Sequence, residues 1–433
     1  MAMDGKELVE KLAKLSQVQS IKDIPQLTHA LFPGTHCPLM GAAMAVGGIK
    51  DSLIVVVGTD ECTYYTKSMT IHSEKFGGID GRCVSVVLDD HDVTFGSAEK
   101  VQEAFKEIIE EYRPQCVFLV TTCVIEIIGD DFDAISEGLS ELYGIPVLPV
   151  HTEHFKCEDH LPGLERTITV CAEMMKSCDS DNSVNLLGQR MGDFATTELY
   201  AMLQKAGVKI GLQLPCGCSV DDIKNAAAAK VNIVVNDIAL PLAQKMQEKF
   251  GIPYVYFNKF VIPEKIYEAY KNLFGYLELE LPGELEGLYQ NAREKIEKNK
   301  GVLEGITYIY GNTPYAVFEM NCFLSSLGMV PQVIQTNRYT EADEPYAKEI
   351  LQYTDPYVCK AANIAPLQYV YDVLSPYLYL GHEFGNRLRQ KGIAIVHSDR
   401  ASGMLGFEVT GYLLQQLVKS VREAKEYRKE LGL

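Results

Sequence analysis

The sequence lacks several features that would indicate its function class directly. Its 433 residues contain no apolar run of membrane-spanning length, and the first residues, MAMDGKELVEKLAKLSQ, have the pattern of an amphipathic helix without the apolar core of a signal peptide. The full sequence also contains no GxxxxGK[ST] phosphate loop, no GxGxxG after an expected strand and no HExxH motif. These absences argue against a membrane protein, a nucleotide-binding enzyme and a zinc hydrolase, and we expect a cytoplasmic protein.

An excess of basic charge is also missing. The formal net charge is −18, whereas a general nucleic-acid binder needs a basic surface, so we expect no nucleic-acid partner. The chain has twelve cysteines but no CxxC pair. In a cytosolic chain of this size, cysteines are metal ligands, redox groups or small buried hydrophobic residues rather than a disulfide framework. Composition alone does not assign them.

Short apolar runs alternate with longer segments of helical period along the whole chain. Runs such as SLIVVVG at 52–58 and CVFLVTT at 116–122 have the continuous apolar character of parallel strands that are covered on both faces. The pattern predicts an α/β fold of three Rossmann-like domains with parallel sheets. We place these domains at residues 1–180, 181–300 and 301–433, the last with a long C-terminal helix. Reactive residues are then expected just after the strands, at their carboxyl ends.

Three cysteines of the first unit lie in such positions. Cys37 is in FPGTHCPLMGA, ahead of the first strong strand, Cys62 is in VVVGTDECTYYT and Cys123 is in FLVTTCVIEIIGDD. Thiolates are the preferred protein ligands of iron-sulfur clusters and soft metals, and a parallel sheet can bring such loops together. The spacing is equally compatible with three unrelated cysteines in a buried sheet, so the residues by themselves leave both interpretations open.

The surrounding segments resemble those of the nitrogenase component 1 family. TTCVIEIIGDD resembles the family's TTC–x–x–x–x–IGDD signature, HCPLMGA resembles its C–x–P–x–GA segment with the proline one place early, and GTDECTYY resembles its G–x–x–x–C–x–Y segment. All three occur in the family's order and at similar separations. The resemblance spans nearly the whole chain but is much looser after about Ser180.

The resemblance implies a function for the three cysteines. Cys37, Cys62 and Cys123 would ligate an iron-sulfur cluster, of 4Fe-4S or P-cluster type, at a subunit interface. An identical or related component 1 subunit would supply the remaining ligands in a dimer or tetramer. An ATP-dependent reductase similar to the nitrogenase iron protein would dock over the cluster, and electrons would pass through it to a second, deeper site.

A second site departs from the family pattern. Family members that hold an active-site metallocluster use a Cys after a second-domain strand, and here the matching stretch VNIVVNDIAL has Asn236 in its place. Cys216 and Cys218, in LPCGCSVDD, are candidate replacement ligands, and their alternative is a loop with two buried or idle thiols. His397, in IAIVHSDRASGMLGFEV, resembles the family's active-site His segment with a one-residue gap. The pattern therefore leaves open whether the chain binds a second, complex iron-sulfur cofactor.

Two further residues have candidate catalytic roles. His160, in HTEHFKCEDH, follows the third strand, and a histidine near a reducible centre can deliver protons. Arg400, close to His397, can neutralise an anionic cluster or an organic acid. The alternatives are a polar loop for His160, a hydrogen-bonded structural residue for His397 and a surface ion pair for Arg400.

Two function classes remain after these observations. The main prediction is an enzyme, namely the iron-sulfur subunit of a nitrogenase-like reductase that takes electrons from an iron protein and reduces a substrate at the second site. The alternative is a scaffold on which a complex iron-sulfur cofactor matures before transfer. A non-catalytic half of a heteromer and a homodimer that serves both roles are also compatible with the sequence. Asn236 argues against an ordinary catalytic subunit and mildly favours the scaffold.

Overall fold

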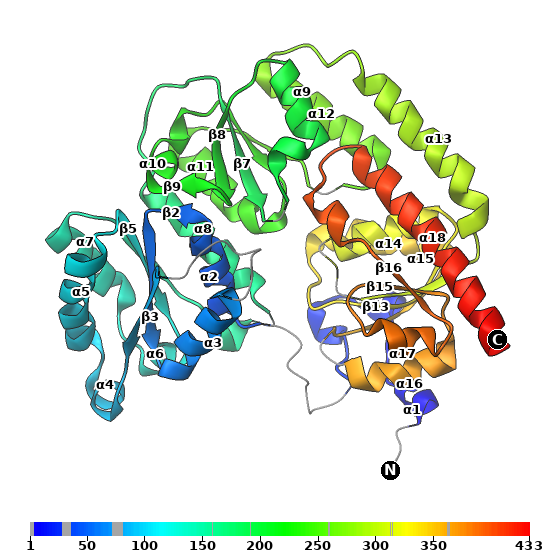
Figure 1. The fold of residues 1–433 in the computed structure, drawn as a ribbon, viewed down its shortest axis with the longest axis horizontal. Coiled ribbons are helices and arrows are strands. Elements are labelled where there is room, and N and C mark those ends of the chain that lie inside the picture. Colours follow the sequence, from blue (N-terminus) through cyan, green and yellow to red (C-terminus); the bar gives the residue numbers. More distant parts are fainter. Residues whose placement is uncertain are drawn as a thin grey trace.

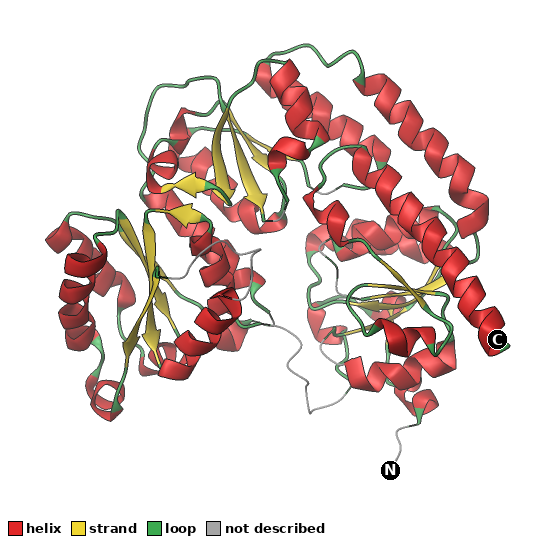
Figure 2. Cartoon of the chain, in the orientation of Figure 1, coloured by secondary structure: helices red, strands yellow, loops and turns green. Residues whose placement is uncertain are grey.

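The protein is an α/β structure with three larger, mainly parallel sheets that are covered by helices (Figures 1 and 2). A fourth, two-stranded parallel sheet joins β2 (Ile49–Lys50) to β9 (Cys218–Ser219). The computed structural model describes residues 4–27, 36–71, 81–157, 159–190, 192–258, 260–311, 313, 315–361 and 364–433. The expected α/β class with parallel sheets is confirmed. The units are arranged around a common centre in Figure 1, with residues 36–157 on one side and residues 301–433 on the other.

The first sheet has the order β4-β3-β5-β6, and all its strand pairs are parallel. Its strands are β3 (Ser52–Gly58), β4 (Cys83–Val87), β5 (Cys116–Thr121) and β6 (Val147–Val150). Every residue of β3 and β5 is buried, as their apolar sequences predict. The covering helices are α2 (Pro38–Gly47), α3 (Asp60–Ile71), α4 (Asp90–Phe95), α5 (Ala98–Tyr112), α6 (Cys123–Ile128), α7 (Phe132–Tyr143) and α8 (Leu161–Val170).

The second sheet is smaller and is also parallel, in the order β11-β10-β7-β8. It consists of β7 (Val184–Gln189), β8 (Ile210–Pro215), β10 (Val231–Val234) and β11 (Tyr254–Tyr256). Its helices are α9 (Glu198–Lys205), α10 (Val220–Lys224), α11 (Leu240–Phe250) and α12 (Pro263–Leu277). The long α13 (Leu285–Leu303) then leads to the third sheet.

The third sheet has the order β1-β14-β13-β12-β15-β16. Five of its strands are mutually parallel: β12 (Thr307–Tyr310), β13 (Val330–Gln335), β14 (Tyr357–Cys359), β15 (Leu378–Leu380) and β16 (Ala394–Val396). Its helices are α14 (Val317–Ser326), α15 (Glu344–Tyr353), α16 (Ile364–Leu374), α17 (Gly385–Arg389) and the 24-residue α18 (Glu408–Leu431).

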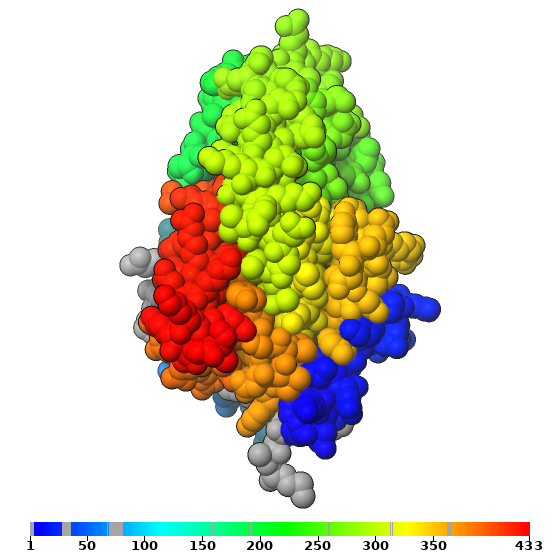
Figure 3. Space-filling model, turned by 90° about the vertical axis from the view of Figure 1, so that its right-hand side faces the viewer, coloured from blue at the N-terminus to red at the C-terminus, as the bar shows by residue number. Residues whose placement is uncertain are grey.

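The N-terminal segment lies with the third sheet and not with the first. Strand β1 (Ala13–Lys14) pairs antiparallel with β14, through Ala13 opposite Val358. Helix α1 (Gly5–Glu10) lies beside α16 in Figure 1, and Figure 3 shows the blue N-terminal residues against the orange and yellow surface of the third unit. Leu8, Leu12 and Leu27 enter the same buried cluster as Ile309 and Val333. This placement differs from our assignment of residues 1–180 to one domain. A short apolar segment does not indicate in its sequence which sheet it will join, so the pairing of β1 with the third sheet was not predicted.

Two glycines fix the contact between α2 and α8. A Cβ on Gly41 would lie 1.9 Å from the carbonyl oxygen of His160, and a Cβ on Gly163 would lie 1.9 Å from that of Pro38. Only glycine permits such close backbone approach. The residue before α2, Cys37, is thereby held near the residue before α8, His160.

Candidate metal centre

The three cysteines of the first unit all lie at helix N-termini. Cys37 is the residue immediately before α2, Cys62 is in the first turn of α3, and Cys123 is the first residue of α6. Helices α3 and α6 follow the carboxyl ends of the neighbouring strands β3 and β5. Helix N-termini present unpaired N–H groups and a positive end of the helix dipole, and both favour a negatively charged group. Their placement therefore suits thiolates.

The side chains of these cysteines are close enough to interact electrostatically. Burial raises the pKa of the Cys123 thiol, and negative charge on Cys62 and Cys37 raises it further. Backbone N–H groups of Val124 and of Cys123 itself act in the opposite direction. All three thiols are partly exposed, so the site opens to the surface. Cys37 and Cys62 thus lie within electrostatic range of Cys123.

The loops that carry Cys62 and Cys123 are packed tightly against each other. A Cβ on Gly58, at the end of β3, would lie 2.1 Å from Oγ1 of Thr122, which directly precedes Cys123. Oγ1 of Thr59 donates a hydrogen bond to Sγ of Cys62 at 3.6 Å. The glycine of the GTDEC segment is therefore required by close packing, and the neighbouring hydroxyl group contacts the thiol.

The arrangement is more open than a site for one metal ion. Within the described ranges, no three His, Cys, Asp or Glu side chains lie close enough together to hold a single ion. A polynuclear iron-sulfur cluster is larger than an ion, so its cysteine ligands lie farther apart around it. Three thiols at helix N-termini, with backbone N–H groups nearby, fit such a group in donor chemistry and in charge.

A chain of polar side chains leads inward from Cys37. Its neighbour His36 lies with Nδ1 2.9 Å from the Tyr65 hydroxyl, and its ring centroid is 6.4 Å from that of His160. Nε2 of His160 is 3.2 Å from a terminal nitrogen of Arg190, and it must accept this hydrogen bond because arginine can only donate. Burial, aided by the Arg190 charge, lowers the pKa of His160 to about 4. His160 is therefore a neutral, fixed acceptor at neutral pH.

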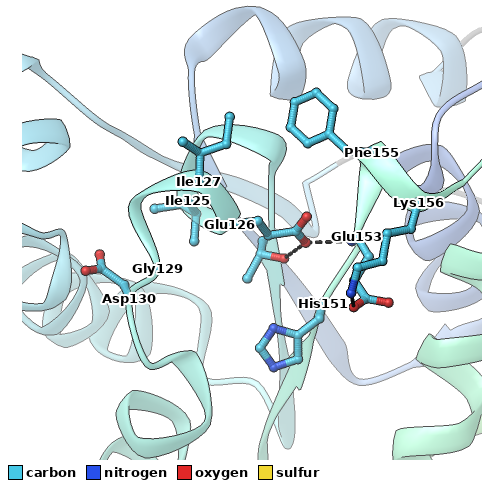
Figure 4. A pocket seen from close by; sticks show the side chains of 10 residues that line it. Ile125, Glu126, Ile127, Gly129, Asp130, His151, Glu153, Phe155 and Lys156 are labelled. Atoms are coloured by element: carbon cyan, nitrogen blue, oxygen red, sulfur yellow. Dashed lines mark hydrogen bonds and ion pairs between the residues drawn. The ribbon is translucent and has the colours of Figure 1, made fainter.

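A cavity of about 360 Å³ lies beside the Cys123 helix (Figure 4). Oε1 of Glu126 accepts hydrogen bonds from Oγ1 of Thr121 at 2.7 Å, Oγ1 of Thr152 at 3.1 Å and the backbone N–H of Glu153 at 2.6 Å. The rest of the lining comes from α6, from the two residues directly after it and from the loop after β6, namely Ile125, Ile127, Gly129, Asp130, His151, Phe155 and Lys156. The glutamate of the TTCVIEIIGDD segment thus ties α6 to the loop that leads to His160.

Large apolar side chains are exposed around these elements. Tyr64 on α3 is 73% exposed, Ile127 on α6 is 71% exposed and Phe155 after β6 is 70% exposed. Two of these side chains thus lie on the helices that carry Cys62 and Cys123.

Comparison with known proteins decides the family. The profile described as nitrogenase component 1 type oxidoreductase matches residues 37–422, which include all three cysteines. The chain belongs to the nitrogenase component 1 type oxidoreductase family. The resemblance that the cysteine segments carry is therefore confirmed.

Curated relatives of this component 1 type chain include cofactor biosynthesis proteins. The chain is 31% identical over 224 residues to the nitrogenase iron-molybdenum cofactor biosynthesis protein NifE of Clostridium pasteurianum, covering 51% of this chain and 49% of that protein. The NifE of Rippkaea orientalis is 25% identical over 333 residues, with 73% and 69% covered. The nitrogenase molybdenum-iron protein alpha chain of Methanosarcina barkeri is 24% identical over 330 residues, with 72% and 62% covered. The chain thus matches about half the length of the first of these relatives.

Solved structures agree with this membership at the level of the fold. The structure titled "Nitrogenase Cp1 at pH 6.5" superposes with a TM-score of 0.78 at 15% identity, covering 94% of this chain and 96% of that one. The structure titled "Nitrogenase Cp1 at pH 5" gives a TM-score of 0.64 at 19% identity, with 97% of each chain covered. The expected nitrogenase component 1 type of fold is confirmed. In the described part of the chain, no helix is both long and apolar enough to cross a bilayer.

The candidate residues for a second site in this component 1 type chain do not converge. Sγ of Cys216 donates to the backbone oxygen of Arg190 at 3.5 Å, whereas Cys218 is 1% exposed and packs in the core with Cys116 and Cys171. His397 follows β16 on the exposed surface, and Arg400 is exposed in the next turn. No hydrogen bond joins His397 or Arg400 to either cysteine within the described residues.

Asn236 has a local structural role. Its Oδ1 accepts the backbone N–H of Ile238 at 3.2 Å and thereby caps the short 3₁₀ helix Asp237–Ala239. A Cβ on Gly188 would lie 2.9 Å from the Cβ of Asn236, so β7 packs closely against this residue. The residue at the position where we expected a thiolate is thus hydrogen-bonded to the backbone.

Two further residues, which no sequence pattern singled out, belong to the surroundings of the cysteines. Arg190 directly follows β7, and Glu126 lies within the Cys123 segment itself. The rule that reactive residues follow strand ends would have found Arg190, because the GQR segment continues directly from an apolar run. Nothing in the sequence alone gives the contact between Arg190 and His160.

Proposed function

We propose that this chain is a scaffold subunit on which a complex nitrogenase-type iron-sulfur cofactor is assembled. Cys37, Cys62 and Cys123 would hold an iron-sulfur cluster, of 4Fe-4S or P-cluster type, in the cytoplasm. The proposal is supported by the position of the three cysteines at three helix N-termini and by the electrostatic effect of Cys62 and Cys37 on Cys123. Bound there, a cluster would supply one-electron redox chemistry and a site for exchange of iron and sulfide.

Two observations favour the scaffold over a catalytic subunit. Several relatives are named as iron-molybdenum cofactor biosynthesis proteins, and the two NifE proteins described above are among them. In addition, Asn236 caps a backbone N–H group and His397 is exposed, so neither offers a buried ligand for a permanently held second cofactor. A site without strong fixed ligands suits a protein that releases its product.

A reductase subunit is the second candidate function. The molybdenum-iron alpha chain of Methanosarcina barkeri aligns with 72% of this chain. The polar side chains of His36, His160 and Arg190 would connect a cluster at Cys37 to the interior, with neutral His160 as the acceptor for Arg190. In this case electrons would come from an ATP-dependent reductase similar to the nitrogenase iron protein.

Both functions need a partner subunit. Three thiolates leave at least one cluster position open, and the exposed Tyr64, Ile127 and Phe155 flank the cysteine loops. An identical or related component 1 subunit that covers these side chains would bring its own thiolates to the same cluster. The chain would therefore act as a dimer or as part of a tetramer.

The test is anaerobic cluster reconstitution followed by iron and sulfide quantification and EPR spectroscopy. Cys62→Ala should lose or convert the cluster signal. Cys178→Ala removes an exposed thiol that is not one of the proposed ligands, and this variant should retain the cluster signal. Unchanged iron content in Cys62→Ala would refute the ligand assignment. Transfer of the cluster to an apo acceptor protein without turnover supports the scaffold, and substrate reduction with an iron protein and ATP supports the reductase.

A further inference from the structure

One of the three cysteine sulfurs accepts a hydrogen bond from a threonine hydroxyl. Thr59 follows the last residue of β3 and directly precedes α3, and its Oγ1 donates to Sγ of Cys62 at 3.6 Å. In the part of the chain that the structure describes, no side chain makes such a bond to the sulfur of Cys37 or of Cys123. The three proposed ligands therefore differ in the polar groups around their sulfur atoms.

The bond lies where the strand order of the first sheet changes direction. Strand β4 lies on one side of β3, and the chain then crosses over to place β5 on the other side. Ligands of open parallel sheets bind at the carboxyl ends of the strands at such a point. Thr59 leaves the carboxyl end of β3, and Cys123 begins the helix that follows β5. The hydroxyl group thus stands where the topology of this sheet favours a ligand.

The spacing of Thr59 and Cys62 explains their contact. Thr59 is at the N-cap position of α3, and Cys62 is the third residue of that helix. Residues at these two positions are in contact in capping boxes, where the side chain of the third residue reaches back toward the N-cap. In this chain the third residue is a cysteine, so the hydroxyl hydrogen meets a sulfur atom. Gly58 holds the turn in place, because a Cβ there would lie 2.1 Å from Oγ1 of Thr122.

The first turn of α3 is otherwise unfavourable for added negative charge. Asp60 and Glu61 lie in this turn, and both are exposed. Like charges repel an electron that is placed nearby. A hydroxyl group that donates to the sulfur acts in the opposite direction, because hydrogen bonds to ligand sulfurs are among the interactions that set the reduction potential of iron-sulfur clusters.

We propose that Thr59 is a positioning residue for Cys62, which stabilises the negatively charged sulfur and thereby raises the reduction potential of a cluster bound there. The inference rests on the proposed function, because it takes Cys62 as a ligand. The hydroxyl group would hold the sulfur in one orientation. It would also favour the reduced state of the cluster, which carries one more electron than the oxidised state.

Redox titration of the reconstituted protein, followed by EPR, tests this role. Thr59→Val replaces the hydroxyl by a methyl group and should move the midpoint potential to more negative values, by up to about tenfold in the one-electron equilibrium constant, or about 59 mV. Thr59→Ser keeps the hydroxyl and should match wild type. Thr94→Val is the control, because this exposed threonine of α4 donates to the backbone oxygen of Asp90. An unchanged or more positive potential in Thr59→Val would overturn the proposal.

A measurement on the metal-free chain separates the effect of Thr59 from the cluster assignment. The thiolate is the form of cysteine that iodoacetamide alkylates, and a hydrogen bond to the sulfur increases its population. A tenfold fall in that population raises the nucleophilicity of the thiolate by about the square root of ten, so alkylation of Cys62 at pH 7 should slow about threefold in Thr59→Val. Peptide mass spectrometry gives the rate, with the exposed Cys178 as internal control.

The two failures give different results. Equal alkylation rates of Cys62 in wild type and Thr59→Val would overturn the proposal whether or not a cluster binds. Iron retained in Cys62→Ala, together with slower alkylation in Thr59→Val, would refute the ligand assignment while the effect of Thr59 on the sulfur stands.

Thr59→Gly separates the hydroxyl from its helix-capping role. Glycine at an N-cap costs a helix little in place of threonine, and it has no hydroxyl to donate. This variant still decides the question if Thr59→Val fails to fold, and its potential and its alkylation rate should shift in the same directions. A Thr59→Gly protein with the potential and the alkylation rate of wild type would show that Thr59 serves the helix alone, and this result would overturn the proposal.

Discussion

His160 and Arg190 form a hydrogen bond of 3.2 Å in which the imidazole Nε2 is the acceptor. The bond joins the residue before α8 to the residue after β7, and therefore links the first and second sheets. Since Arg190 is always charged, protonation of His160 would place two positive charges together. This relationship has a consequence for stability that depends on pH.

Acidification should destabilise the protein through His160. Its pKa is lowered from the usual 6.5 to about 4 in the folded state, so the unfolded chain binds a proton more readily between these values. The stabilisation is complete above pH 6.5 and is lost progressively as the pH falls toward 4. At pH 5 the loss from this one group should be about 2 kcal/mol. Urea unfolding at pH 7 and pH 5 measures it.

The control for this prediction is His160→Gln, which keeps an acceptor for Arg190 but does not titrate in this range. Its free energy of unfolding should fall less between pH 7 and pH 5 than that of wild type. An equal fall in both proteins would show that other groups cause the pH dependence.

Gly41→Ala should disturb the cysteine site from a distance. The new methyl group would lie 1.9 Å from the His160 carbonyl oxygen, so α2 and α8 must separate. We expect a loss of about 1–3 kcal/mol in the free energy of unfolding. Cys37, at the start of α2, should move with its helix, and iron content after reconstitution should fall.

Gly138→Ala is the matched control, because Gly138 lies within helix α7 and a Cβ there meets open space. It should stabilise the protein by about 0.5–1 kcal/mol and leave iron binding unchanged. If Gly41→Ala behaves in the same way, the close contact between α2 and α8 is not what holds Cys37.

The sequence predicts the sheets better than it predicts the site. The fully buried strands Ser52–Gly58 and Cys116–Thr121 are visible as apolar runs, and the cysteines at their ends follow from the rules for parallel sheets. By contrast, the pairing of Ala13 with Val358 joins residues that are far apart in the sequence, and no local pattern predicts it. The different environments of Cys216 and Cys218 are also hidden, because they depend on a turn at Gly217, whose φ is +87°.

Glu126→Ala should loosen the loop that leads to His160. Three donors, the Thr121 and Thr152 hydroxyls and the Glu153 N–H, converge on one carboxylate oxygen, and truncation leaves them without it. Loss of hydrogen bonds to a charged group should cost about 1–3 kcal/mol. Urea unfolding gives this cost, and hydrogen exchange should show faster exchange at Glu153. Glu137→Ala on the exposed face of α7 should change neither quantity.

Phe155→Asp should weaken association with a partner subunit while leaving the fold intact. The ring is 70% exposed beside the cavity of Glu126, so its replacement removes little from the core of this chain. A charge buried without a partner at an interface is costly, and association should weaken at least tenfold. Analytical ultracentrifugation of the reconstituted protein measures this effect. Phe95→Asp, which changes a ring that is 76% exposed at the end of α4, is the matched control. Equal association of the Phe155 and Phe95 variants would exclude Phe155 from the contact surface and would direct the search for that surface to Tyr64 on α3.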